Sequence, residues 1–275
     1  QNFPESFSFS NIISQYCNSI KNIHNFQILE TLILITKLDQ ATFDICIQIY
    51  PLLKNIVERD NTHYLERTGF AQLCITLLQK GIPFQQYFFE QFEIPKLFQI
   101  FIEIDEFIDG RKDPTANSTE EITLFDFTDL GTEIFNIYII LLTLEKREMS
   151  EFVLNTIDQS FLLNTIVKLT DPFDICLCGF FIAACHFYQT IFISFPQSLN
   201  DVILDLIKLL FSLCDTSYKL KIEIIFTLSL FCCSEKSDLI PFLVQNELIK
   251  NIMSAIDENQ KTIVFLRSLK VIVDY

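Results

Sequence analysis

Residues 237–275 read SDLIPFLVQNELIKNIMSAIDENQKTIVFLRSLKVIVDY, and this stretch predicts a short helix, a second helix and a longer third helix in succession. The helices are expected at about 237–245, 247–257 and 260–274, with weak breaks between them. Apolar residues recur at three- and four-residue spacings and form a stripe on each helix: Leu239, Phe242, Leu243, Leu248, Ile249, Ile252, Ile256, Ile263, Leu266, Leu269 and Ile272. Three such helices cannot hide all of their stripes from water within one unit, so neighbouring units must stack against them.

Part of this stretch is repeated elsewhere in the chain. LIKNIM, residues 248–253, has a near copy in LLKNIV, residues 52–57. The shared pattern of two apolar, two polar and one apolar residue begins at residues 12, 52, 162 and 248, and looser copies begin at residues 94 and 202. Four of the five steps between these copies, all but the step from 94 to 162, have the length of about 40 to 47 residues that is typical of helical repeats. In LIKNIM we expect Leu248, Ile249 and Ile252 to face inward.

The long step between residues 94 and 162 has a visible cause. Residues 105–121 read DEFIDGRKDPTANSTEE, and they contain Gly110, Pro114 and a Ser/Thr/Asn cluster that cannot continue a helix. The sequence therefore predicts an acidic loop, at about residues 104–122, inserted into an otherwise regular array.

The arrangement resembles the armadillo-type repeat of importin-α and β-catenin, in which a short first helix, a second helix and a long third helix stack into a superhelix. The resemblance implies an all-α fold, a right-handed α-α superhelix of about five to six three-helix repeats. Residues 1–275 would form a single solenoid apart from the acidic loop. Its third helices would line a concave groove that holds extended peptides, and they are expected at about 26–38, 62–79, 123–146, 173–192, 216–232 and 260–274.

Composition narrows the classes of protein to which the chain can belong. Only 5 Gly and 8 Pro occur in 275 residues, which favours helices over a β-sandwich or a Gly-rich nucleotide-binding domain. The net charge of -15 argues against a nucleic-acid partner, because phosphates are bound by clustered Lys and Arg. The 9 Cys lie in apolar helical stretches, which indicates reduced thiols and a cytoplasmic or nuclear location.

A membrane-spanning segment is an alternative for residues 175–200, which contain no formally charged residue. However, His186, Gln189, Thr190 and Pro196 interrupt this segment, and no Lys/Arg cluster flanks it. A helix buried in a large core explains the same residues, so membrane association is the less favoured interpretation.

The predicted third helices supply candidate partner-binding residues. Grooves of the importin-α kind carry Trp and Asn four residues apart, and the corresponding pairs here are Phe135 and Ile139, Phe180 and Ala184, and Phe226 and Leu230. The chain has no Trp, and no aligned pair supplies the Asn that would bond to a peptide backbone. The three rings could instead contact an amphipathic helix or an apolar peptide, although Phe at helical spacing is also typical of a core.

Charge supplies a second set of candidates. Residues 103–133 contain ten acidic residues against Arg111 and Lys112, so this segment carries -8 of the net charge of -15. Glu106, Asp109, Glu120 and Glu121 would attract a basic partner, while the competing interpretation is a solvated loop.

Signatures of catalysis are missing from the sequence. It has 3 His and no Gly-rich phosphate loop, nucleophile elbow or HExxH motif. Cys176 and Cys178 lie about 200° apart on a helix, which does not suit a metal site with Cys185 and His186. We therefore expect no catalytic residue, cofactor or metal.

The resulting hypothesis is an interaction scaffold or adaptor that binds a basic or amphipathic protein or peptide through its third helices or its acidic loop. The alternative is a cargo carrier similar to nuclear transport receptors, and a membrane-associated protein or a helical enzyme is less favoured.

Overall fold

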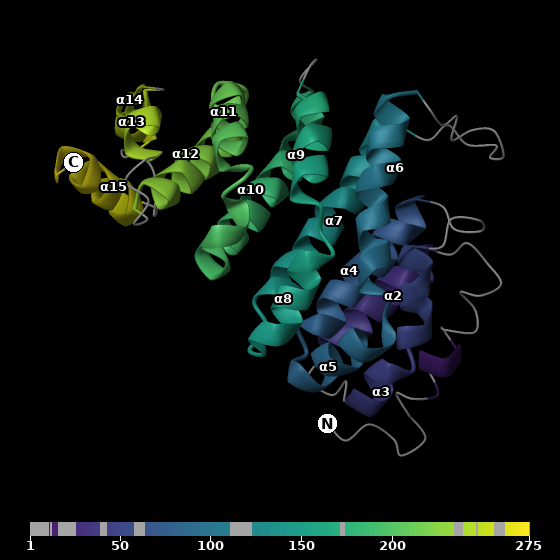
Figure 1. Cartoon of the computed structure of the whole chain (residues 1–275). Coiled ribbons are helices and arrows are strands. Elements are labelled where there is room, and N and C mark those ends of the chain that lie inside the picture. The colour runs from purple at the N-terminus through teal and green to yellow at the C-terminus, as the bar shows by residue number, and fades with distance from the viewer. Residues whose placement is uncertain are drawn as a thin grey trace. The chain divides into compact units, whose positions relative to one another are not determined.

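The computed structural model of the chain describes residues 11, 13–15, 26–38, 43–57, 64–110, 123–170, 174–233, 239–245, 247–255 and 262–274. Within these residues the regular secondary structure is entirely helical (Figure 1). The chain divides by its internal contacts into two compact units, which we call unit 1 (Gln1–Ile157) and unit 2 (Asp158–Tyr275). Whether residues 1–275 act as one solenoid stays a prediction.

Unit 1 contains a succession of short, intermediate and long helices. In chain order they are α2 (Phe26–Lys37), α3 (Phe43–Ile47), η1 (Tyr50–Ile56), α4 (Tyr64–Leu78), α5 (Ile82–Gln91), η2 (Ile94–Phe98), α6 (Gln99–Ile108), α7 (Leu124–Leu142) and α8 (Arg147–Asn155). Helices α2, α4 and α7 correspond to predicted third helices, and each packs on the next (Figure 1).

Unit 2 continues the same order of helices. They are α9 (Gln159–Lys168), η3 (Ile175–Leu177), α10 (Cys178–Ser194), η4 (Pro196–Leu199), α11 (Ile203–Leu213), α12 (Tyr218–Cys232), α13 (Leu239–Gln245), α14 (Leu248–Ala255) and α15 (Thr262–Asp274). The third helices of this unit are α10, α12 and α15, and α12 packs on both of the others. All six predicted third helices are thus confirmed, with ends that differ by a few residues.

Two features depart from the expected pattern. The LLKNIV copy forms most of a 3₁₀ helix, η1, rather than an α-helix, with Pro51 in its first turn and Leu52, Leu53 and Ile56 buried. In LIKNIM, Leu248 and Ile252 are buried, but Ile249 is 39% exposed, so its predicted inward position was wrong. Ile249 directly follows Leu248, so its side chain lies about 100° further around the helix, away from the side on which Leu248 and Ile252 are buried.

The start of the predicted acidic loop is also helical. Helix α6 runs to Ile108. Ile100, Phe101 and Ile104 lie on one side of this helix and are buried, so the helix packs on the core along its length. Residues 111–122 lie outside the described residues.

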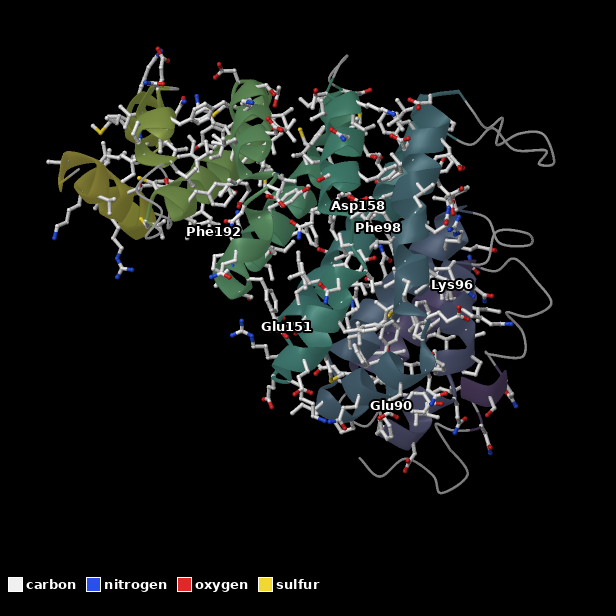
Figure 2. All side chains as sticks on the ribbon, in the orientation of Figure 1. Glu90, Lys96, Phe98, Glu151, Asp158 and Phe192 are labelled. Carbon is white, nitrogen blue, oxygen red and sulfur yellow. The ribbon has the colours of Figure 1, made fainter. Side chains whose placement is uncertain are left out.

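Aromatic rings fill much of the core between third helices. In unit 2 the rings of Phe192 on α10 and Phe231 on α12 lie 4.5 Å apart, and Phe192 is labelled in Figure 2. The segment Ile175–Ser194 is the one described helix long and apolar enough to span a membrane, yet 61% of its most apolar window is buried inside the structure. A core helix of a folded domain passes the same test, so this segment is weak support for a membrane span.

Candidate functional site

The third helices α4 and α7 of unit 1 leave one side of each helix exposed. We call this surface the unit 1 face, and it comprises the exposed Leu65, Gln72, Gln79, Phe125 and Asp129 with the partly exposed Glu133 and Asn136. These positions are seven residues apart along α4 and just past its end, and four, four and three residues apart along α7, which keeps each set on one side of its helix.

A chain of hydrogen bonds joins the two helices across the unit 1 face. Gln72 Nε2 on α4 donates to Glu133 Oε1 on α7 at 3.0 Å. Asn136 Nδ2, one turn further along α7, donates to Glu133 Oε2 at 3.1 Å. Each amide uses one N–H in this arrangement, so its carbonyl oxygen and second N–H are the kinds of group that bond to a peptide backbone.

Helix α7 makes the unit 1 face anionic. It carries Asp126, Asp129 and Glu133, and neither Lys nor Arg occurs between residues 123 and 145. Partial burial, together with repulsion from Asp126 and Glu133, raises the pKa of Asp129 above its ordinary value. A raised carboxyl pKa means that negative charge at this position is unfavourable until a cation approaches.

A buried ion pair fixes α4 beneath the unit 1 face. Arg67 Nη1 lies 2.9 Å from Glu103 Oε2 of α6, and the two side chains are 1% and 2% exposed. Arg67 Nε donates to the Ile56 carbonyl oxygen of η1 at 2.8 Å. The Tyr64 hydroxyl donates to the same Glu103 oxygen at 2.7 Å, and the guanidinium carbon lies 4.7 Å from the Tyr64 ring centre. These bonds tie three helices of unit 1 to one buried guanidinium.

The third helices of unit 2 are also bridged by polar side chains. His186 Nε2 of α10 lies 3.1 Å from Glu223 Oε2 of α12, at the exposed side of both helices. Deeper between them, Gln189 Nε2 donates to Thr227 Oγ1 at 2.9 Å. The Thr227 hydroxyl in turn donates to the Glu223 carbonyl oxygen at 2.7 Å, so this buried pair is hydrogen-bonded on both sides.

The candidate partner-binding residues from the sequence fall into three groups. Phe135, Phe180 and Ala184 are buried, being 0%, 2% and 4% exposed, and the Phe135 ring centre lies 4.8 Å from that of Phe101. The remaining described candidates are partly or fully exposed: Glu106, Asp109, Ile139, Phe226 and Leu230. Glu120 and Glu121 lie outside the described residues. A role of these ten residues in partner binding stays a prediction.

Sequence reasoning missed Gln72, Glu133 and Asn136 as members of an exposed face. Matching the Trp position to Phe135 selected the apolar side of α7, about 100° away from Asn136 on the helix. The polar residues at 129, 132, 133 and 136 form a three- and four-residue pattern of their own, and that pattern marks the exposed side.

The described residues contain no group of three or more His, Cys, Asp or Glu side chains arranged to hold a metal ion. Of the nine cysteines the structure describes eight, and no disulfide joins any of these eight; Cys74 and Cys185 are among the buried ones.

No protein-family model matches the sequence, and no curated protein matches it either. Among solved structures, the chain is similar to a designed armadillo repeat protein, with a TM-score of 0.60. That similarity covers 96% of this chain and 100% of the designed one, at 10% sequence identity. The chain therefore has the armadillo-type all-α repeat fold that the helix pattern predicted.

Proposed function

We propose that the chain is a protein-interaction scaffold or adaptor whose unit 1 face binds an extended basic segment of a partner protein. The observation that carries this proposal is the arrangement of Gln72, Glu133 and Asn136, linked across α4 and α7 at 3.0 and 3.1 Å. Amide groups held in place on successive third helices suit an extended backbone, and the carboxylate between them suits a Lys or Arg side chain.

Electrostatics supports the basic character of the partner segment. Asp129 has a raised pKa because it is partly buried near Asp126 and Glu133, so a bound cation would relieve that repulsion. The net charge of -15 would also steer a basic segment toward the chain.

Exposed apolar side chains at the edge of the same face support a role in contact with long side chains. Leu65 of α4 is 50% exposed and Phe125 of α7 is 38% exposed. Aliphatic stems of Lys and Arg pack on such groups while their charged ends reach carboxylates. The proposal includes a cytoplasmic or nuclear location, which is supported by the lack of disulfides among the described cysteines.

Fluorescence anisotropy with a labelled 12-residue peptide of alternating Lys, Arg and Ala tests the proposal. The intact chain should bind this peptide more tightly than a matched peptide in which Gln replaces every Lys and Arg. Asp129→Asn and Glu133→Gln should each weaken binding about five- to tenfold, as expected when one charge contact is lost.

The matched control for these variants is Glu93→Gln. Glu93 is an exposed carboxylate that pairs with Lys96 at the start of η2, between α5 and α6. The Glu93→Gln substitution therefore removes one negative charge at a position outside the unit 1 face. Binding that falls equally in Glu93→Gln, or that stays unchanged in Glu133→Gln, contradicts the proposed site.

A further inference from the structure

Helices α12 and α15 of unit 2 form an exposed surface whose character differs from that of the unit 1 face. Along α12 and its C-terminal cap, Lys219, Glu223, Phe226, Leu230 and Cys233 are separated by four, three, four and three residues, which returns each of them to one side of the helix. Lys219 and Cys233 are exposed, and Phe226 and Leu230 are partly exposed.

Helix α15 adds two cations to this surface. Phe265 and Ser268 turn toward the core and are 0% exposed, and the Cys232 thiol donates to the Ser268 carbonyl oxygen at 3.7 Å. Arg267 and Lys270 lie on the opposite, exposed side of the helix. We call the surface formed by Lys219, Phe226, Leu230, Arg267 and Lys270 the cationic face.

Arg267 is close to the end of the α12 stripe. Burial raises the pKa of the Cys233 thiol, and the positive charge of Arg267 opposes that rise. The two helices also pack directly on each other. The partly exposed apolar groups of α12 therefore lead toward the cations of α15.

Within the described part of unit 2, the cations of this surface differ from other cations in forming no ion pair with a carboxylate. Lys208 pairs with Asp205 at 2.7 Å, Lys250 with Glu247 at 2.8 Å and Lys221 with Asp215 at 3.5 Å. Among the described residues, no carboxylate forms an ion pair with Lys219, Arg267 or Lys270.

Glu223 is the one carboxylate on α12, and it lies on the same stripe, one turn from Lys219 and one turn from Phe226. Its Oε2 lies 3.1 Å from His186 Nε2, so this carboxylate is bonded to α10. The chain has 35 acidic residues and 20 Lys and Arg, so three cations on two adjacent helices that form no ion pair within the described residues depart locally from the overall charge.

We propose that the cationic face binds an acidic amphipathic segment of a partner protein, with its carboxylates on Lys219, Arg267 and Lys270 and its apolar side chains on Phe226 and Leu230. Charge complementarity selects the acidic segment, and the partly exposed ring and leucine select one that also carries apolar residues. This is a second site, with a partner chemistry opposite to that of the unit 1 face.

A peptide fits this surface better than a polyanion does. Nucleic acid and anionic membranes extend their negative charge well beyond three cations, and the net charge of -15 would repel them. A short acidic segment presents its charge only where the cations lie.

The test uses the intact chain and a labelled 16-residue peptide in which Glu pairs alternate with Leu and Phe. A matched peptide has Gln in place of every Glu. We expect the acidic peptide to bind at least tenfold more tightly than its Gln counterpart, with an affinity that falls as salt is raised. The double variant Arg267→Gln/Lys270→Gln should lose about tenfold in affinity, and Phe226→Gln should weaken binding without changing the salt dependence.

The matched control is Lys208→Gln/Lys250→Gln, which removes two exposed cations from the second helices α11 and α14. A charge-reversed variant, Arg267→Glu/Lys270→Glu, should lose the acidic peptide and gain affinity for one with Lys in place of Glu. All four substituted cations are exposed, so circular dichroism melts should stay close to that of the unaltered chain.

Three results overturn this inference. They are equal affinity for the acidic and Gln peptides, equal loss in the control variant, and tighter binding to vesicles of phosphatidylserine and phosphatidylcholine than to the peptide. Binding of the basic peptide to the unit 1 face should be unaffected by Arg267→Gln/Lys270→Gln, so failure of one site is distinguishable from failure of the other.

Discussion

The Arg67–Glu103 pair allows a sharp prediction about stability. Glu103→Leu removes a carboxylate that accepts from Arg67 Nη1 at 2.9 Å and from the Tyr64 hydroxyl at 2.7 Å. Arg67 is 1% exposed, so its charge would remain in the core without a counter-ion. We expect a loss of about 3–5 kcal/mol in the free energy of unfolding of unit 1, and a similar loss for Arg67→Met.

The double variant Arg67→Met/Glu103→Leu separates the cost of an unpaired buried charge from the cost of losing the hydrogen bonds of the pair. It leaves no buried charge, but the Ile56 carbonyl loses its donor at 2.8 Å and the Tyr64 hydroxyl loses its acceptor. Those two groups should together cost about 1–3 kcal/mol, so the double variant should be more stable than either single variant by about 2 kcal/mol.

Urea unfolding followed by circular dichroism, with hydrogen exchange of the α4 and α6 amides as a local readout, measures these differences. Arg147→Ala/Glu151→Ala is the control, because that pair is 74% and 50% exposed and should contribute about 0.5 kcal/mol or less. The reasoning is refuted if Glu103→Leu costs no more than this control, or if the double variant loses the sum of the two single losses.

Three further predictions concern single side chains. Asp129→Asn should raise the free energy of unfolding at pH 7 and leave it unchanged below pH 3, as measured by urea unfolding. The pKa of Asp129 is raised in the folded state, so the ionised carboxylate lowers the free energy of unfolding as pH rises through the titration, and Asn removes that loss. Tyr188→Phe should be neutral or slightly stabilising in thermal melts, because the buried Tyr188 hydroxyl makes no hydrogen bond to the described residues, and a clear loss would reveal a missed partner. Ile193→Glu on α10 should fold and stay soluble without detergent, because Ile193 is 67% exposed. Ala184→Glu should unfold the chain, because Ala184 is 4% exposed and the new carboxylate would be buried. If neither variant folds without detergent, the membrane interpretation is favoured.

The repeat architecture could be predicted because it depends on apolar spacing that every unit repeats. The final unit shows this well, since Leu239, Leu243, Leu248, Ile252 and Phe265 are all buried on successive helices. The residues at which each helix ends and the next begins could not be predicted. Residues 104–108 continue α6 because Ile104 is buried, although the acidic composition of that segment favoured a loop.

The exposed faces were harder to predict because they depend on the angular position of each side chain. An error of one residue on α7 exchanges Asn136 for Phe135, and so exchanges a surface amide for a core ring. Cross-helix contacts such as Gln72 with Glu133 join residues 61 positions apart, and no local pattern pairs them. That no described carboxylate forms an ion pair with Lys219, Arg267 or Lys270 likewise depends on three-dimensional placement.

The buried bond between Gln189 and Thr227 has a consequence for how the chain can change over evolutionary time. Apolar side chains between α10 and α12 could slide by one turn and still be buried, whereas this 2.9 Å bond exists in a single register. Losing Thr227 alone removes the acceptor of the buried Gln189 amide, whereas Thr227 keeps its bond to the Glu223 carbonyl when Gln189 is lost. In descendants of this sequence, a Gln at position 189 should therefore be inherited together with a hydroxyl at position 227, and an apolar residue at 227 should appear only where 189 has also become apolar.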